Sequence, residues 1–423
     1  MRALLVPVAA LLLSQAFLLA GHGLQLTLLP LRATLEGFSD TQVAFTGSAY
    51  FIGFVVGCML TPRIVQKVGH IRAFAVMASS YSAAALAFDL VPHFASWLLL
   101  RVLSGVTISG LYMVLESWLN ERATPDTRGT LLGVYTLINL LMVVAGQMLV
   151  NAAAPEASTL FAIAAILISF AVLPVSLSTA IAPAPPTSAK VDVPRVWRMA
   201  PVALGGAMAS GIITGAFWSL GPVYGRKIGF DTFDITLLMT ASVVGGALLQ
   251  IPLGRLSDLF DRRLVLLGTA LAGAIASLGL VPLGAGGHTL FMVGVWGACT
   301  MTLYAICVAH ANDHAEPGEF VTVATVILLV NGGSGAIGAP LASLCMELIG
   351  PGGLFAFCAG VLGLFSAGTM YRLTTRARPV LDETGPFIAV AEVTPAALEM
   401  DPRVDTAEEL EEIGPVPPLA SAA

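Results

Sequence analysis

The sequence predicts an all-α membrane protein with twelve transmembrane helices in two pseudosymmetric six-helix bundles. Composition, a count of apolar runs and an internal repeat all lead to this fold class. Of the 423 residues, 57% are hydrophobic and 11% are charged, against about 25% charged in a typical soluble domain. On folding, a soluble chain of this length would still expose roughly a quarter of the surface that its unfolded chain exposes. With this composition, too much of that exposed surface would be apolar. The same figures exclude a disordered chain and a nucleic-acid-binding protein.

Twelve apolar runs have the length that a helix needs to cross a bilayer core, about 20 residues. They cover residues 5–30, 43–62, 73–91, 95–116, 129–151, 158–178, 199–222, 235–253, 264–283, 289–310, 321–348 and 352–373. The first run follows Arg2 and starts like a signal peptide, but it continues to Pro30, which is too long for one. We therefore expect it to be retained as a helix.

Basic residues between the runs predict the orientation, because an even number of spans puts both ends of the chain on one side. That side carries fifteen basic residues: Arg2, Arg63, Lys67, Arg72, Arg122, Arg128, Lys190, Arg195, Arg198, Arg255, Arg262, Arg263, Arg372, Arg376 and Arg378. The opposite side carries three: Arg32, Arg226 and Lys227. Since positively charged loops stay in the cytoplasm, we expect both termini to be cytoplasmic, in a plasma or inner membrane.

A break between the sixth and seventh runs divides the chain. Residues 179–198 contain four prolines and predict a cytoplasmic linker. We therefore expect an N-terminal six-helix bundle over 1–178 and a C-terminal one over 199–373. Residues 374–423 form an acidic, proline-containing tail, predicted to be disordered and solvated.

The two predicted bundles repeat each other at a constant offset. Pro30 corresponds to Pro222, which sets the offset at 222 − 30 = 192. The same offset relates Gly37 and Gly229, Gly53 and Gly245, Arg63 and Arg255, Gly105 and Gly297, Tyr112 and Tyr304, Asn139 and Asn331, and Gly146 and Gly338. A register kept through helices and loops indicates two parallel repeats, with a substrate site expected at their interface.

The loop after the eighth run, residues 252–263, reads PLGRLSDLFDRR. It resembles the G-x-L-x-D-R-x-G-R-R loop of the major facilitator superfamily, although Asp261 stands at the second glycine. The equivalent first-half loop, residues 62–72, is degenerate, with Gln66 in place of the aspartate. The run ESWLNER at 116–122 is similar to the YcaD-like branch of that family. The resemblance implies a transporter that works by alternating access.

The resemblance also implies that these two loops gate the cytoplasmic side. The candidate gating residues are Gly254, Arg255, Asp258, Arg262, Arg263, Arg63, Lys67, Gly69 and Arg72. Asp258 could accept hydrogen bonds from a neighbouring helix N-terminus. Arg262 and Arg263 could pair with carboxylates on the facing half. The alternative is that the arginines only set the topology.

Polar residues inside the spans are candidates for the solute and proton pathway, because burying them in lipid is costly. The candidates are His22, Gln25, Arg101, Tyr112, Glu116, Asn139 and Asn331. The spacing of Arg101, Tyr112 and Glu116 puts them on one helical stripe. Two alternatives stay open: Arg101 and Glu116 could snorkel at the span ends, and the histidine and asparagines could serve packing alone.

Two patterns imitate other kinds of site. Residues 333–338 read G-x-G-x-x-G, but they lie inside an apolar run instead of after a strand, so a nucleotide site is not expected. His310, Asp313 and His314 could suggest a metal, but their repeat mates belong to an ordinary loop. No nucleophile–base pair or phosphate-binding loop is present, so neither an enzyme nor a cofactor or metal is expected.

The sequence therefore predicts a secondary active transporter that moves a small solute by alternating access. Proton coupling is expected, because titratable groups lie inside the spans. Efflux is slightly favoured, because an apolar cavity suits amphipathic solutes better than sugars. The alternatives are an uptake permease for a small organic metabolite and a transporter-like membrane sensor. We expect a monomer in the bilayer, with no nucleic-acid partner.

Overall fold

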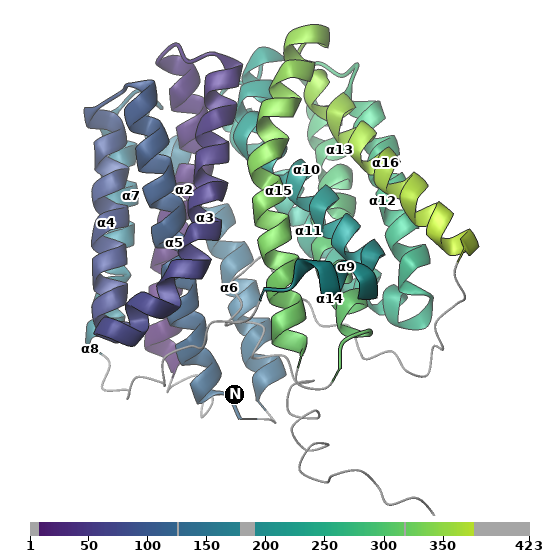
Figure 1. Ribbon diagram of the computed structural model, residues 1–423. Helices are drawn as coiled ribbons and strands as arrows, with labels where there is room; N and C mark the ends of the chain where they lie inside the picture. The colour runs from purple at the N-terminus through teal and green to yellow at the C-terminus, as the bar shows by residue number, and fades with distance from the viewer. Residues whose placement is uncertain (1–7, 125–126, 178–190, 317–318, 376–423) are drawn as a thin grey trace, which may run out of the picture.

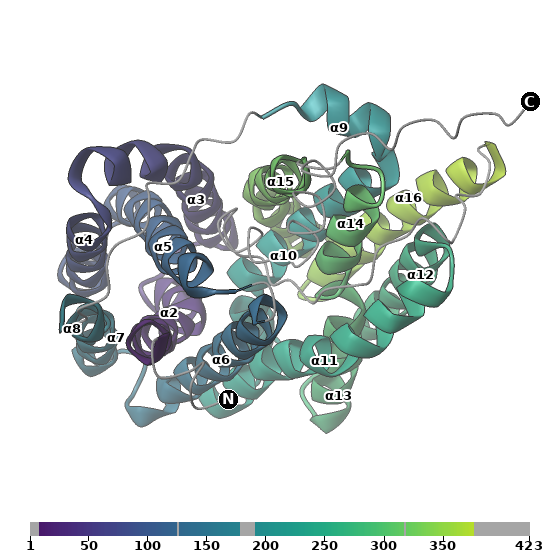
Figure 2. The same cartoon turned by 90° about the horizontal axis from the view of Figure 1, so that it is seen from below.

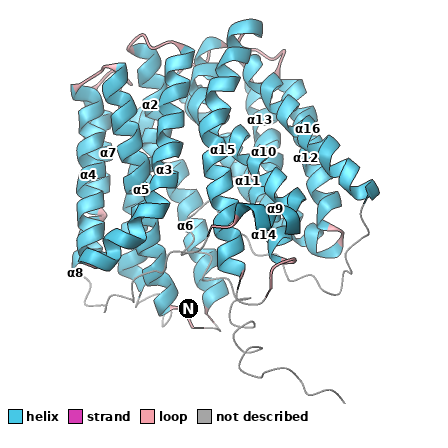
Figure 3. Cartoon of the chain, viewed as in Figure 1, coloured by secondary structure: helices cyan, strands magenta, loops and turns pink. Residues whose placement is uncertain are grey.

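The computed structural model describes residues 8–124, 127–177, 191–316 and 319–375. Within these ranges, twelve helical segments are long and apolar enough to cross a membrane, which confirms the predicted fold class. Every regular element of the described chain is helical (Figure 3). The helices form two groups, α2–α8 and α10–α16, which lie side by side (Figures 1 and 2).

The first group holds six spans. They are α2 (Ala9–Leu35), α3 (Asp40–Val68), α4 (His70–Leu90), α5 (Phe94–Arg122), α6 (Arg128–Met148) with the 3-10 turn η2 (Leu149–Ala152), and α7 (Ser158–Phe170) continued by α8 (Val172–Leu177). The second group holds the other six. They are α10 (Pro201–Lys227), α11 (Thr232–Leu259), α12 (Arg262–Leu280), α13 (Gly287–Thr300) continued by α14 (Leu303–Asn312), α15 (Phe320–Ile349) and α16 (Gly353–Thr375).

Several helices extend beyond the apolar runs that predicted them, because polar caps and amphipathic turns continue them. Helix α3 starts after Ser39, whose side chain and Gln42 form a capping box. Helix α11 starts after Asp231, which accepts a hydrogen bond from the backbone of Asp234. Ser39 and Asp231 are related by the offset of 192, so the repeat extends to the helix caps.

Part of the expected linker and nearly all of the expected tail lie outside the described residues. Of the linker 179–198, the described part begins at residue 191, and Val193–Met199 forms the short helix α9. Of the tail 374–423, only Thr374 and Thr375 are described, at the end of α16.

Helix packing repeats with the sequence. A Cβ at Gly53 of α3 would collide with the backbone carbonyl of Val102 on α5, and one at Gly245 of α11 would collide with that of Gly294 on α13. Both partners differ by 192, so the same backbone approach occurs in each half. Two other repeated approaches join α2 to α6 and α10 to α15: Gly146 with Ala20, Gly338 with Ile212, Gly23 with Val143, and Gly215 with Gly335. Close helix approach at small residues is the usual packing mode in membranes.

The two halves contact each other near one end of the bundle. We call the end where α3 meets α4 the arginine-rich face and the other end the opposite face. On the opposite face, Lys227 pairs with Asp40, and Thr41 Oγ1 donates to Glu347 Oε1 at 2.6 Å. These four residues are called the latch. Deeper in, Gly47 packs against Ser219, and Phe51 against Gly335. The halves are thus packed together from the opposite face to the middle of α3.

Candidate functional site

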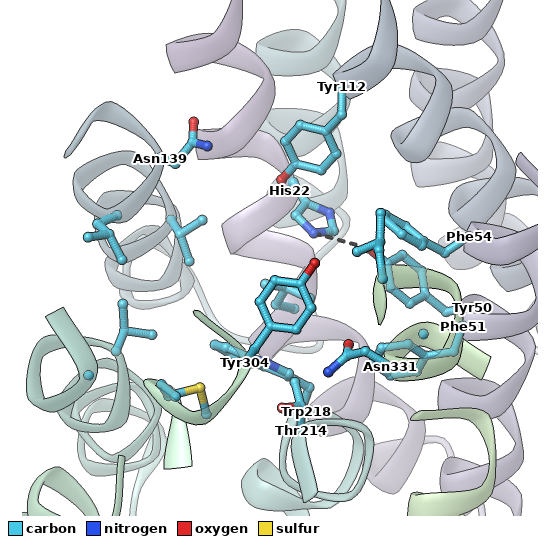
Figure 4. Close-up of a pocket in the computed structure, with 18 of the residues that line it drawn as sticks. His22, Tyr50, Phe51, Phe54, Tyr112, Asn139, Thr214, Trp218, Tyr304 and Asn331 are labelled. Atoms are coloured by element: carbon cyan, nitrogen blue, oxygen red, sulfur yellow. Dashed lines mark hydrogen bonds between the residues drawn. The ribbon is translucent and has the colours of Figure 1, made fainter. Parts of the chain in front are cut away.

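A cavity of about 240 Å³ lies between the two halves (Figure 4). Helices α2, α3, α5 and α6 line it from the first half, and α10, α11, α14 and α15 from the second. His22 is the middle residue of α2 and Thr214 is the middle residue of α10. Since both line the cavity, it lies near the midplane of the bundle, where the repeat architecture predicts a substrate site.

Five of the seven candidates from the sequence line this cavity: His22, Arg101, Tyr112, Asn139 and Asn331. The other two do not. Gln25 is 2% exposed and its side-chain amide bonds to none of the described groups. Glu116 is completely buried but connects to the cavity through other side chains.

Arg101 is held against α3. Its Nε donates to the backbone carbonyl of Thr46 at 3.3 Å, and its guanidinium lies 4.8 Å from the centre of the Tyr50 ring. The residue is only 6% exposed. The alternative in which Arg101 snorkels at the end of its span is therefore wrong, because its charge faces the interior of the protein.

His22 is fixed by two tyrosines. Its Nδ1 lies 2.7 Å from the Tyr81 hydroxyl. Its Nε2 lies 3.4 Å from the Tyr50 hydroxyl, the contact marked by the dashed line in Figure 4. Tyr50 is also the ring on which Arg101 rests. His22 and Arg101 therefore share Tyr50 as a neighbour. The proton-relay role of His22 stays a prediction.

Glu116 anchors a chain of hydrogen bonds that ends in the cavity. The Tyr135 hydroxyl donates to Glu116 Oε1 at 2.6 Å. Gln15 Nε2 donates to both Tyr135 Oη at 3.2 Å and Asn139 Oδ1 at 2.9 Å. Asn139 lines the cavity. Because Glu116 is 0% exposed, the alternative of a snorkelling residue at the span end is wrong here too.

The repeat also organises the cavity walls. The Tyr112 and Tyr304 hydroxyls both point toward the space beside His22 (Figure 4). Asn331 donates from Nδ2 to the carbonyl of Ala207 at 3.3 Å. Eight pairs of lining residues are related by the offset of 192: His22 and Thr214, Leu26 and Trp218, Phe51 and Val243, Phe54 and Gly246, Tyr112 and Tyr304, Thr136 and Leu328, Asn139 and Asn331, and Leu140 and Gly332. Applying the offset to each first-half candidate would have found Tyr304 and Thr214 from the sequence.

The loop at the arginine-rich face of the second half holds a cluster of ion pairs. Arg262 Nε lies 2.7 Å from Asp313 Oδ2, and Arg262 Nη2 lies 3.2 Å from Asp258 Oδ1. Arg263 pairs with Asp261 at 2.8 Å. These pairs lie within the second half, whereas the sequence predicted carboxylate partners on the facing half. The cross-half pairing stays a prediction for another conformation.

Asp261, which stands at the second glycine of the loop motif, is the N-cap of helix α12. Its φ of −52° needs no glycine, and its carboxylate accepts the backbone N–H of Arg263 at the start of α12. Burial alone would raise the pKa of Asp261, but hydrogen bonds from Arg263 and the guanidinium charge lower it below its usual value. In the first-half loop, Gly69 makes the turn with a φ of +83°. The remaining basic candidates are exposed: Arg63, Lys67, Arg72 and Arg255.

Comparison with known proteins agrees with this architecture. The chain is 28% identical over 337 residues to the uncharacterized MFS-type transporter YcaD of Shigella flexneri and of Escherichia coli O139:H28, which covers 79% of this chain and 87% of each relative. The structure superposes on the nucleoside transporter NupG with a TM-score of 0.74, at 12% identity, over 88% of this chain and 100% of that one.

Two other solved structures share the fold. A bacterial homologue of the human lysosomal transporter Spinster, in an inward-facing and occupied conformation, matches with a TM-score of 0.69 at 14% identity, over 89% of this chain and 97% of that one. A D-xylose–proton symporter matches with a TM-score of 0.67 at 13% identity, over 89% and 99%. The Major Facilitator Superfamily profile matches residues 11–231 and 202–398. This multi-pass membrane protein therefore belongs to the Major Facilitator Superfamily.

Proposed function

We propose that this protein is a proton-coupled secondary transporter that exports a small solute by alternating access. The bundles 1–178 and 199–373 would rock about the cavity between them. The observation that carries the proposal is the cavity itself, which is lined by both halves at mid-helix. A site in this position is exposed to one side of the membrane or the other as the halves tilt.

The charge distribution supports an orientation with both termini in the cytoplasm. The arginine-rich face carries Arg63, Lys67 and Arg255, whereas the opposite face carries Arg32 and Lys227. The described contacts of α3 with the second half run from the opposite face to the bundle middle. With the termini in the cytoplasm, this arrangement would correspond to an inward-facing state, in which solute would enter from the cytoplasm.

Glu116 is the best candidate for the coupling proton. Among the residues that the structure describes, it is the one acidic side chain with no exposed surface. Its chain through Tyr135 and Gln15 to Asn139 links the carboxylate to the cavity wall. A proton at Glu116 would turn an acceptor into a donor for Tyr135, and the change would pass along the hydrogen bonds to the solute.

The cavity walls favour export of a partly apolar solute over import of a sugar. Phe51, Phe54 and Trp218 supply aromatic surface, and Leu26, Val143 and Leu140 supply aliphatic surface. A polyhydroxylated solute would leave many hydroxyls without partners against such walls. An amphipathic solute would bury its apolar part there and use the few polar groups for orientation.

The test is transport by the purified protein in liposomes with a pH-sensitive dye inside. A transporter moves protons when solute is added, and an exporter moves them opposite to the solute. Proton movement in the same direction as the solute would identify the uptake permease instead. Solute binding without any flux of solute or protons would leave the membrane sensor as the function.

A further inference from the structure

Arg101 brings an incompletely bonded charge into the cavity. A guanidinium has five N–H donors. The Nε group donates to Thr46, and the hydrogen bonds described for Arg101 include none from its Nη groups to the protein. The side chain is 6% exposed and lines the cavity. A charge this deeply buried needs an oppositely charged or strongly polar partner.

The cavity provides no acidic partner of its own. Among its described lining residues, the titratable side chains are Arg101, His22 and tyrosines. Glu116 lies fifteen residues along α5 from Arg101 and outside the lining, which is about 22 Å along a helix. The Tyr50 ring offers its π-face, which attracts a cation but does not neutralise it.

The charge is also unnecessary for the packing of this helix. The repeat mate of Arg101 is Val293 on α13, which is completely buried. Helices α3 and α5 make the same close approach as α11 and α13. The second half therefore builds this helix pair with an aliphatic side chain at the same position, so packing does not explain the arginine.

Neighbouring side chains hold the guanidinium in one orientation. Tyr81 and Tyr50 both contact His22, which steadies the Tyr50 ring beneath Arg101. The contact with the Tyr50 ring and the bond to Thr46 restrict the guanidinium. Because Thr46 engages Nε and the residue lines the cavity, the Nη groups remain for a solute, in the forked arrangement that suits a carboxylate.

From this arrangement we propose that the solute is a monovalent organic anion, whose carboxylate pairs with Arg101 and whose flat apolar body lies against Phe51, Phe54 and Trp218. This inference rests on the proposed transport function for its setting. A single buried cation matches one negative charge, so a dianion is disfavoured. Asn139 and Asn331, one from each half, would orient the body of the solute with the amide atoms that Gln15 and Ala207 do not engage.

The test is equilibrium binding to the full chain, purified in detergent, by titration calorimetry. The probes are benzoate, 1-naphthoate and indole-3-acetate, each beside its neutral primary amide, with phenyl phosphate as a dianion. We expect at least one carboxylate to bind about tenfold or more tightly than its amide, as a charge-assisted pair predicts. Carboxylates that bind no better than their amides, or not at all, overturn the proposal.

Substitutions test whether Arg101 is the cation that binds the carboxylate. We expect Arg101→Gln to lose the preference for carboxylate over amide, and Arg101→Lys to retain part of it, since an ammonium keeps the charge but not the fork. The control is Arg198→Gln, an exposed arginine on α9, which should bind like the wild type. A preference that survives Arg101→Gln overturns the proposal. If Arg101→Gln does not fold, the wild-type comparison still decides.

Measuring binding and transport separately distinguishes a failure of the anion site from a failure of the proposed transport function. Carboxylate binding through Arg101, without flux in liposomes, would keep the anion site and remove the transporter. Proton-coupled flux of neutral or cationic solutes, without carboxylate binding, would keep the transporter and remove the anion site.

Discussion

The two halves of this protein share a scaffold and differ in chemistry. The same glycine–carbonyl contacts bring α3 to α5 and α11 to α13. Arg101 and Glu116 on α5 correspond to Val293 and Val308, both of them buried aliphatic residues of the second half. At these two positions of the repeat, the buried charges are thus confined to the first half, where the close approach of the helices does not require them.

The difference is reversed at the arginine-rich face. Asp258 and Arg262 form an ion pair in the second-half loop, whereas Gln66 and His70 occupy the corresponding positions in the first half. His70 is buried and bonds to Ser117 at 3.0 Å. We therefore propose that the charged residue for the solute comes from the first half and that the charged cytoplasmic gate comes from the second.

The largest effect is expected from Arg101→Ala. Transport should fall by about 100-fold or more, because two hydrogen bonds to a charged group contribute about 3 kcal/mol. Its repeat mate gives the matched control: Val293→Ala should lower stability by about 1–2 kcal/mol while leaving the rate per inserted molecule unchanged. Flux in vesicles, with insertion checked by protease protection, measures both. Equal losses in the two variants would mean that the halves do not differ in function.

Glu116→Gln should have the next largest effect. The amide oxygen can still accept the hydrogen bond from Tyr135, but it cannot carry a proton. We expect solute binding to persist and gradient-driven accumulation to fall to passive equilibration. Val308→Ala, at the repeat mate, is the control and should leave coupling intact. Accumulation that still follows the pH gradient in Glu116→Gln would assign the proton to another group.

Asp258→Asn tests whether the second-half loop has a gating role that the first-half loop lacks. Removing the charge weakens the pair with Arg262, so we expect the rate to fall about tenfold or less, in line with a charge-assisted bond on a partly exposed residue. Folding and solute affinity should not change. Gln66→Asp restores the missing carboxylate to the first half and should alter the rate without altering solute choice. Wild-type flux in Asp258→Asn would remove the gating role.

The smallest effect is expected at the latch. Asp40→Asn removes one ion pair with Lys227, which is partly exposed, and such pairs contribute at most about 1 kcal/mol. Opening toward the opposite face should therefore increase by no more than about fivefold. Thiol labelling of Ser219→Cys, which packs against Gly47, measures this opening once native cysteines are replaced. Slower labelling would show that the pair favours the open state.

Much of the fold could be predicted because a bilayer demands long apolar helices and both halves obey one register. The exact helix ends could not, because hydropathy detects only the apolar core. Helix α3 continues to Val68 through Pro62, well past its apolar run. The break between α13 and α14, at Met301 and Thr302, left no signal in the composition.

The candidate site was only partly predictable, because helix rotation depends on packing. Gln15 and Gln25 lie on the same helix, yet Gln15 joins the chain to Glu116 and Gln25 stays outside the cavity lining. Tyr81 and Tyr135 looked like ordinary aromatic residues of apolar runs. Only the tertiary structure brings them to His22 and Glu116.

The repeated glycine contacts have a consequence for how such a protein can evolve. Contacts such as Gly53 with Val102 and Gly245 with Gly294 join backbone to backbone, so they place no demand on the side chains around them. After an ancestral gene duplication, one copy could acquire an arginine or a glutamate inside a helix while the helix pair kept its geometry. New specificities could then arise by single substitutions in one copy, while the backbone contacts keep the helices of both copies in place.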